Sequence, residues 1–120
     1  MRTLHMLHSL DAEVGKLAST VRNGFKWADL KQDEHIELCV CTPKEHGIET
    51  FNADHEVQGR GLVKALWFGY IKDIPARILR FEHEERSRNY YGLLDSMRYA
   101  YGKEFSEDSP VTVIVYKRVR

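Results

Sequence analysis

The stretch GRGLVKALWFGYI, residues 59–71, is the longest candidate β-strand in the chain. Apolar side chains lie on both of its faces, which is typical of a central strand that is covered on both sides. Three glycines, Gly59, Gly61 and Gly69, interrupt it. Glycine inside a strand often marks a bulge or a tight bend. The stretch therefore predicts a long and strongly bent central strand.

Two shorter segments have the pattern of neighbouring strands. In HIELCVC, residues 35–41, apolar side chains alternate with polar or thiol side chains, which predicts a strand with one buried face. VTVIVYKRV, residues 111–119, is apolar on both faces as far as Tyr116 and is predicted to be a buried terminal strand. Residues 43–56 are polar and rich in turn residues, so we expect a loop there.

A first helix is predicted from DAEVGKLASTVRNG, residues 11–24. Asp11 can cap its start, and Gly24 can end it. Apolar residues recur at helical spacing on one face. They are Val14, Leu17, Ala18 and Val21.

A second helix is predicted from NYYGLLDSMRYAYG, residues 89–102, with Asn89 as its cap and Gly102 at its end. Its apolar residues also recur at helical spacing. They are Tyr90, Leu93, Leu94, Met97 and Tyr101. Residues 72–88, which precede it, are ambiguous because Pro75 and many charges break any clean period.

Strands outnumber helices in this pattern, and the two helices are far apart in the sequence. The expected fold class is α+β: a small curved or barrel-like sheet of about five to six strands with two flanking α-helices, rather than a doubly wound parallel sheet. The 120 residues are enough for one domain with its own core. No linker or repeat divides the chain.

The charge balance limits the possible partners. Eighteen basic residues balance eighteen acidic ones, so no overall positive field attracts a nucleic acid duplex. Binding to nucleic acid must be local, and a nucleotide or a short unpaired segment is the expected partner. The N-terminal MRTLHMLHSL lacks the apolar region of a signal peptide, and no apolar run is long enough to span a bilayer.

The only cysteines, Cys39 and Cys41, lie two residues apart. On a strand their side chains share a face but are poorly placed for a mutual disulfide. Reduced thiols and a cytoplasmic location are the simplest interpretation. Combined with His46 or His55, they match no zinc module, so we expect neither a metal nor another cofactor.

Several motifs, in order along the chain, resemble the ASCH domain family. The Gly-x-Lys of Gly24 and Lys26, the following LKQDEHIEL, the stretch GRGLVKALWFGYIKDIP, and YYGLLDSMRYAYG followed by VTVIVYKRV are similar to the family's successive elements. The resemblance implies a PUA-like fold, a small β-barrel with flanking helices, as one domain over residues 1–120. It also implies a role with RNA or modified nucleosides.

One branch of that family consists of amidohydrolases that deacetylate acetylcytidine, and the resemblance implies catalytic positions here. Lys26 matches the branch's lysine, Asp29 stands where that branch has threonine, and Lys31 stands where it has arginine. Glu85 matches the catalytic glutamate if a one-residue gap is allowed. The other candidates for that carboxylate are Glu82 and Glu84.

The resemblance therefore implies a cleft between the segment around Lys26 and the charged residues 82–88. On a strand, Lys26 and Trp27 would point to opposite faces, and a Lys26–Asp29 ion pair is possible. For hydrolysis of an amide, a carboxylate of residues 82–88 would be a general base toward water, with Lys26 as the partner acid or as an oxyanion donor. The expected ligand-binding residues are Lys26, Trp27, Lys31, Arg60, Arg86, Arg88 and Tyr91.

Each of these features can also be explained without any function in binding or catalysis. Lys26 can be a solvated lysine beside a core tryptophan, and residues 82–88 can be a solvated loop with internal ion pairs. Tyr91 and Tyr99 lie off the apolar stripe of the second helix and can cover a cleft. Three functions stay open: binding of RNA or a modified nucleoside, hydrolysis of an acylated nucleoside, and regulation through protein interaction.

Overall fold

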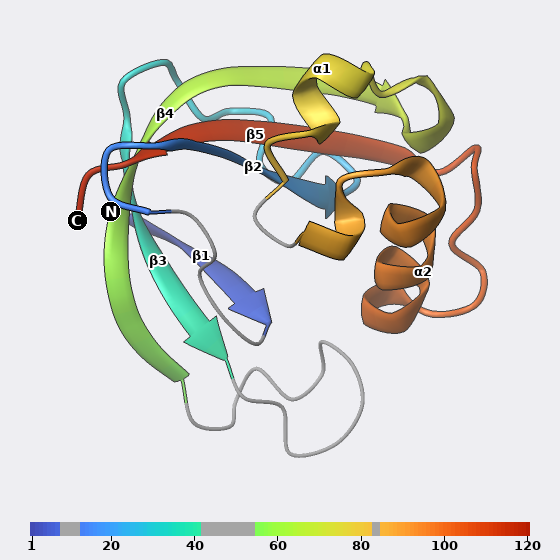
Figure 1. Ribbon diagram of the computed structural model, residues 1–120, viewed down its shortest axis with the longest axis horizontal. Coiled ribbons are helices and arrows are strands. Elements are labelled where there is room, and N and C mark those ends of the chain that lie inside the picture. The colour runs from blue at the N-terminus through green and yellow to red at the C-terminus, as the bar shows by residue number, and fades with distance from the viewer. Residues whose placement is uncertain (8–12, 42–54, 83–84) are drawn as a thin grey trace.

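A five-stranded sheet with the order β1-β3-β4-β5-β2 forms the framework of the protein. The structure is a computed structural model that describes residues 1–7, 13–41, 55–82 and 85–120. The strands are β1 (Arg2–Leu7), β2 (Leu17–Asn23), β3 (His35–Cys41), β4 (His55–Tyr70) and β5 (Pro110–Arg118). β1 is parallel to β3, and all the other neighbours are antiparallel. The sheet curls into a half-barrel (Figure 1), which confirms the expected curved, barrel-like α+β architecture.

The long strand β4 bends around the half-barrel, as the sequence predicted (Figure 1). Its register with β3 shifts between Leu38 and Cys39, beside the predicted bulge at residues 59–61. A Cβ atom on Gly61 would lie 3.0 Å from the ring of Tyr116. Glycine at this position therefore allows β4 to approach the side chain of its neighbour β5.

Two clusters of apolar side chains pack on the two faces of the sheet. The cluster inside the half-barrel consists of Leu4, Met6, Ala18, Leu30, Ile36, Leu38, Val63, Ile114 and Tyr116. The cluster under the helices consists of Val21, Ile71, Leu79, Leu93, Met97, Phe105, Val111 and Val113. β5 contributes residues to both clusters, which explains why its sequence is apolar on both faces.

Helix α2 (Tyr90–Tyr101) covers one face of the sheet and agrees with the predicted second helix. The side chain of Asn89 accepts a hydrogen bond from the backbone N–H of Gly92 at 2.9 Å, as expected for a cap. Leu93 and Met97 of the predicted apolar stripe are buried. Short turns occupy the segment that was ambiguous in sequence. They are η2 (Ile71–Asp73), α1 (Ala76–Leu79) and η3 (Glu85–Ser87).

The predicted first helix over residues 11–24 is wrong. Residues 17–23 form strand β2, which pairs with β5 from Leu17 opposite Lys117 to Asn23 opposite Val111. Helical spacing of the apolar residues was misleading because both faces of this strand are buried, so its interior residues carry no alternation. Pairing with a distant strand outweighs a weak local preference. Gly24, with φ of 72°, ends a strand rather than a helix.

Two of the expectations concern residues that are wholly or mostly outside the described chain. Asp11 and most of the predicted loop at residues 43–56 lie outside the described residues, and β4 already begins at His55. β1 at the N-terminus was not predicted. Within the described residues, no helix has the length and apolar character needed to cross a membrane.

Candidate functional site

The segment around Lys26 forms turns after β2 rather than a strand. Lys26 is exposed, and its ammonium lies 5.7 Å from the centre of the Trp27 ring. Its backbone carbonyl accepts a hydrogen bond from Arg2 at 3.0 Å. Trp27 is partly buried against the cluster inside the half-barrel. The prediction that the two side chains point to opposite faces of a strand is therefore wrong.

Asp29 interacts with Arg2. The Arg2 guanidinium donates a hydrogen bond to the Asp29 carboxylate and lies 4.4 Å from the centre of the Trp27 ring. The hydrogen bond from Arg2 holds the pKa of the Asp29 carboxyl below its ordinary value of 3.8. Within the described residues, Asp29 thus forms its ion pair with Arg2 and not with Lys26.

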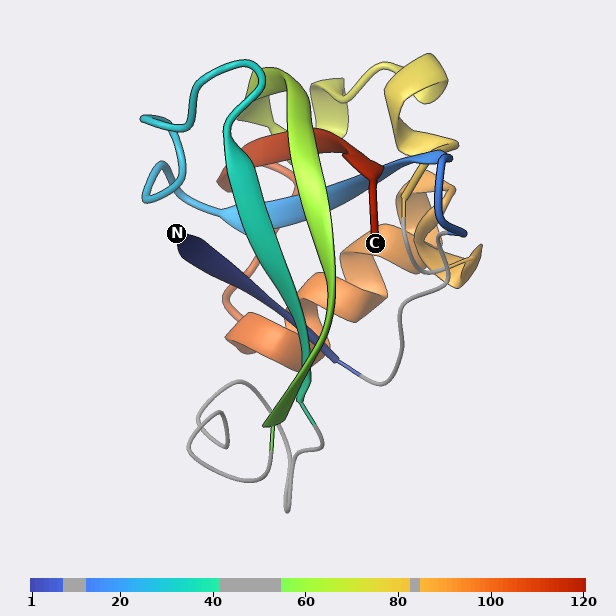
Figure 2. The ribbon, with the colours of Figure 1, turned by 90° about the vertical axis from the view of Figure 1, so that its left-hand side faces the viewer.

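The charged residues before α2 lie elsewhere. Glu85, Arg86 and Arg88 are exposed residues in and after η3, and Arg88 donates from Nε to the carbonyl of Glu82 at 2.9 Å. Glu82 itself is buried beside Ser19 of β2. Figure 2 shows the turns of residues 24–34 and the η3 turn on opposite sides of the molecule. The structure therefore does not bring Lys26 and Glu85 together.

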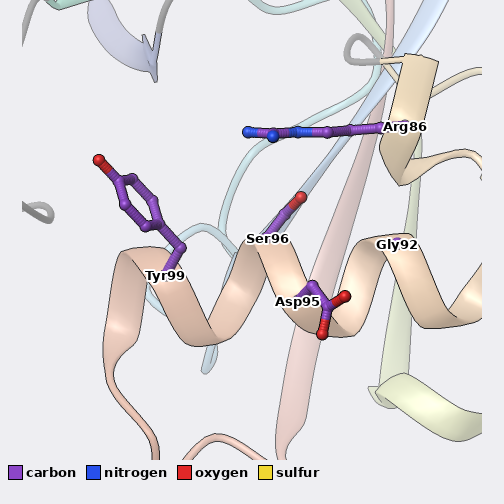
Figure 3. Close-up of a pocket in the computed structure, with 5 residues that line it drawn as sticks. All are labelled: Arg86, Gly92, Asp95, Ser96 and Tyr99. Carbon is purple, nitrogen blue, oxygen red and sulfur yellow. The ribbon is translucent and has the colours of Figure 1, made fainter.

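A pocket lies instead between η3 and α2. Its volume is about 270 Å³, and it is lined by Arg86, Gly92, Asp95, Ser96 and Tyr99. Figure 3 shows the Arg86 side chain extended along α2, above Ser96 and toward the Tyr99 ring. Of the residues predicted to bind a ligand, Arg86 alone lines this pocket.

The local sequence explains why η3 packs closely on α2. A Cβ atom on Gly92 would collide with the backbone carbonyl of Arg86, so glycine allows the two segments to touch. The hydroxyl groups of Ser87 and Ser96 lie 2.8 Å apart and share a hydrogen bond. Ser87 is buried at this contact. These two contacts fix the position of the backbone from which Arg86 extends.

The lining residues offer complementary chemistry. Tyr99 presents an aromatic ring that is 42% exposed. Arg86 supplies a fork of N–H donors, and Asp95 supplies carboxylate acceptors. Ser96 adds a hydroxyl that can donate or accept. A flat polar molecule can therefore stack on the ring and form hydrogen bonds at its edge.

Asp95, Ser96 and Gly92 were not predicted from the sequence as lining residues of a pocket, although their spacing in the sequence indicates a shared face. Together with Tyr99, they occupy positions i, i+3, i+4 and i+7 of one helix, which lie on one face. The apolar stripe of α2 defines its buried side. The polar stripe next to it could have been recognised by the same spacing.

The other predicted ligand residues lie apart from the pocket lining. Tyr91 is 77% exposed on α2. Lys31 is exposed in the turns after β2, where its backbone N–H donates to the side chain of Glu34. Arg60 is half-buried on β4, and its Nε has no hydrogen-bond partner among the described residues.

The structure offers no metal site within the described residues, where no three histidine, cysteine or acidic side chains gather. The Cys39 thiol is fully buried in β3. His46, one of the weighed metal ligands, lies outside the described residues.

Comparisons with known proteins leave the family open. No protein-family model, curated protein or solved structure matches the chain. The resemblance to the ASCH family therefore rests on the sequence motifs alone.

Proposed function

We propose that the protein is a PUA-like domain of the ASCH type that binds an unpaired nucleobase, either in single-stranded RNA or in a modified nucleoside. The observation that supports this proposal is the pocket between η3 and α2, where an arginine, a carboxylate and an aromatic ring surround one hollow. The position differs from the cleft expected from the sequence, whereas the class of ligand is the same.

The dimensions of the pocket suit a small planar group. Its volume of about 270 Å³ lies just below the range of about 300–1,000 Å³ that drug-sized ligands occupy. The exposed ring of Tyr99 is a platform for stacking, which contributes about 1–3 kcal/mol per base. Such a contribution does not depend on a high positive charge, and this chain has a formal net charge of zero.

The polar groups suggest which bases would be preferred. The Asp95 carboxylate can accept a hydrogen bond from an exocyclic amino group, as acidic side chains do with cytosine. Arg86 can donate to a phosphate or to a base carbonyl. Cytosine should therefore bind more tightly than uracil, which has no amino group.

Hydrolysis of an acylated nucleoside has less support. Neither Lys26 nor Glu85 lines the pocket between η3 and α2, and Asp29 is paired with Arg2. Regulation through protein interaction has no residue-level observation in its favour. We therefore propose binding, with acetate release from acetylcytidine as the result that would favour hydrolysis instead.

The test compares two tyrosines of the same helix. Tyr99 lines the pocket, whereas Tyr91 is more exposed and does not. In fluorescence anisotropy with a labelled oligocytidine, we expect Tyr99→Ala to weaken binding about 5- to 150-fold. Tyr91→Ala should stay within about twofold of the wild type, since surface changes away from the contact have small effects.

A third variant tests the base preference. Asp95→Asn should reduce the preference for oligocytidine over an oligouridine of equal length, because an amide oxygen accepts a hydrogen bond less strongly than a carboxylate. Equal losses in Tyr99→Ala and Tyr91→Ala would contradict the assignment of the pocket. So would a wild type that binds neither oligonucleotide at low salt, where electrostatic contacts are strongest.

A further inference from the structure

Arg22 is a buried charged side chain that connects the two edges of the sheet. It extends from β2, and only 8% of it is exposed. One of its terminal nitrogens donates to the backbone carbonyl of His5 in β1 at 2.8 Å. β1 and β2 are the first and last strands in the order of the sheet. We call the line along which these edge strands face each other, bridged by Arg22, the seam.

Among the described residues, all the partners of this guanidinium are neutral. Besides the carbonyl of His5, Nε donates to the hydroxyl of Thr20 at 3.1 Å, and the second terminal nitrogen contacts the sulfur of Met6 at 3.1 Å. A thioether is only a weak acceptor. Among the residues that the structure describes, no carboxylate forms an ion pair with Arg22.

A buried positive charge with neutral partners is unusual. Buried charges in proteins are normally paired, because removal from water is costly and dipoles compensate for it only in part. A guanidinium stays protonated in proteins, so Arg22 cannot escape this cost by losing a proton. Within the described part of the chain, three of its five N–H donors have the partners named above, which leaves two for a further acceptor.

We propose that Arg22 marks a binding site for a small oxyanion at the seam. The guanidinium fork fits the oxygens of a carboxylate or a phosphate, and both groups share this chemistry. The site lies on β2, separate from the pocket between η3 and α2, and it does not depend on the function proposed for that pocket. Its occupant would neutralise the charge and stabilise the contact between β1 and β2.

The experiment measures the midpoint of thermal unfolding, Tm, of the full chain. Inorganic phosphate and acetate are titrated at low millimolar concentration against sodium chloride of equal ionic strength. The two arms distinguish a phosphate site from a carboxylate site. At about ten times the Kd, we expect the preferred anion to raise the Tm of the wild type by roughly 5 °C.

The Arg22→Met variant removes the charge and keeps an apolar side chain. In chloride it should unfold at a Tm no lower than that of the wild type, because replacing a buried charge by an apolar group is often neutral or stabilising. It should also lose the rise caused by the anion. A rise of equal size in Arg22→Met, or no rise in the wild type with either anion, would overturn the proposal.

Two more variants complete the design. Arg22→Lys keeps the charge but lacks the planar fork, so we expect the anion to raise its Tm by less than half as much as that of the wild type. A rise in Tm equal to that of the wild type would overturn the proposal, even if Arg22→Met failed to fold. Tyr99→Ala changes only the pocket on α2 and should keep the full rise. The proposal of an anion site and the proposal of a base-binding pocket are thus tested independently of each other.

Discussion

Arg2 holds the turns after β2 through three different contacts. Its guanidinium pairs with Asp29, donates to the carbonyl of Lys26 and stacks on the ring of Trp27. We expect Arg2→Ala to lower the free energy of unfolding by about 1–2 kcal/mol from the ring and carbonyl contacts alone. Asp29→Asn should have a smaller effect, because exposed ion pairs contribute little. Urea unfolding of the two variants checks this order.

The dependence on pH isolates the ion pair from the other contacts of Arg2. The pKa of Asp29 is lower in the folded protein than its ordinary value of 3.8, because Arg2 hydrogen-bonds to the charged form. The pair therefore stabilises the fold fully above that value, and its contribution is lost as the pH falls through the lower, folded pKa. The difference in Tm between wild type and Asp29→Asn should be present at neutral pH and vanish in acid. A difference that persists in acid would show that the pair is not its cause.

At the scale of the element, the contact between η3 and α2 depends on Gly92. Alanine is a better helix former than glycine by about 1 kcal/mol, so helix propensity alone predicts that Gly92→Ala stabilises the protein. A Cβ atom there would instead collide with the carbonyl of Arg86. We expect a net loss of about 1–3 kcal/mol, as for other overpacked sites.

The matched control for Gly92→Ala is Tyr91→Ala, one residue earlier in the same helix. Tyr91 is 77% exposed, so its replacement should change the free energy of unfolding by less than about 0.5 kcal/mol. Urea unfolding of both variants gives the comparison. A Gly92→Ala variant more stable than the wild type would mean that η3 does not pack on α2 as described.

At the scale of the whole molecule, the sequence predicted the elements whose pattern is local. Helix α2 has its own cap and stripe, and β4 has its glycines and apolar faces. β2 was mistaken for a helix because its identity depends on pairing with β5, about ninety positions away. The structure does not bring Lys26 and Glu85 together for a related reason: whether two segments about sixty positions apart meet depends on the pairing of distant strands, which no local pattern specifies. The polar stripe that lines the pocket, by contrast, is present in the sequence.

Because residues 17–23 form strand β2 and not a helix, they are an edge of the sheet that hydrogen exchange can detect. In an antiparallel edge strand, successive N–H groups point alternately toward the sheet and away from it. Gly24 donates to Pro110 at the start of β5, so the amides of Thr20 and Arg22, spaced by two, should also point toward β5 and exchange slowly.

The amides of this edge that point outward should exchange differently. Val21 and Asn23 should exchange fast, whereas Ser19 should be slow because it donates to the carbonyl of Phe81. A helix over residues 11–24 would instead protect consecutive amides through its i to i−4 bonds. Residue-resolved exchange by NMR separates the two patterns. Uninterrupted protection from Ser19 to Gly24 would restore the helix and remove the edge at which Arg22 meets β1.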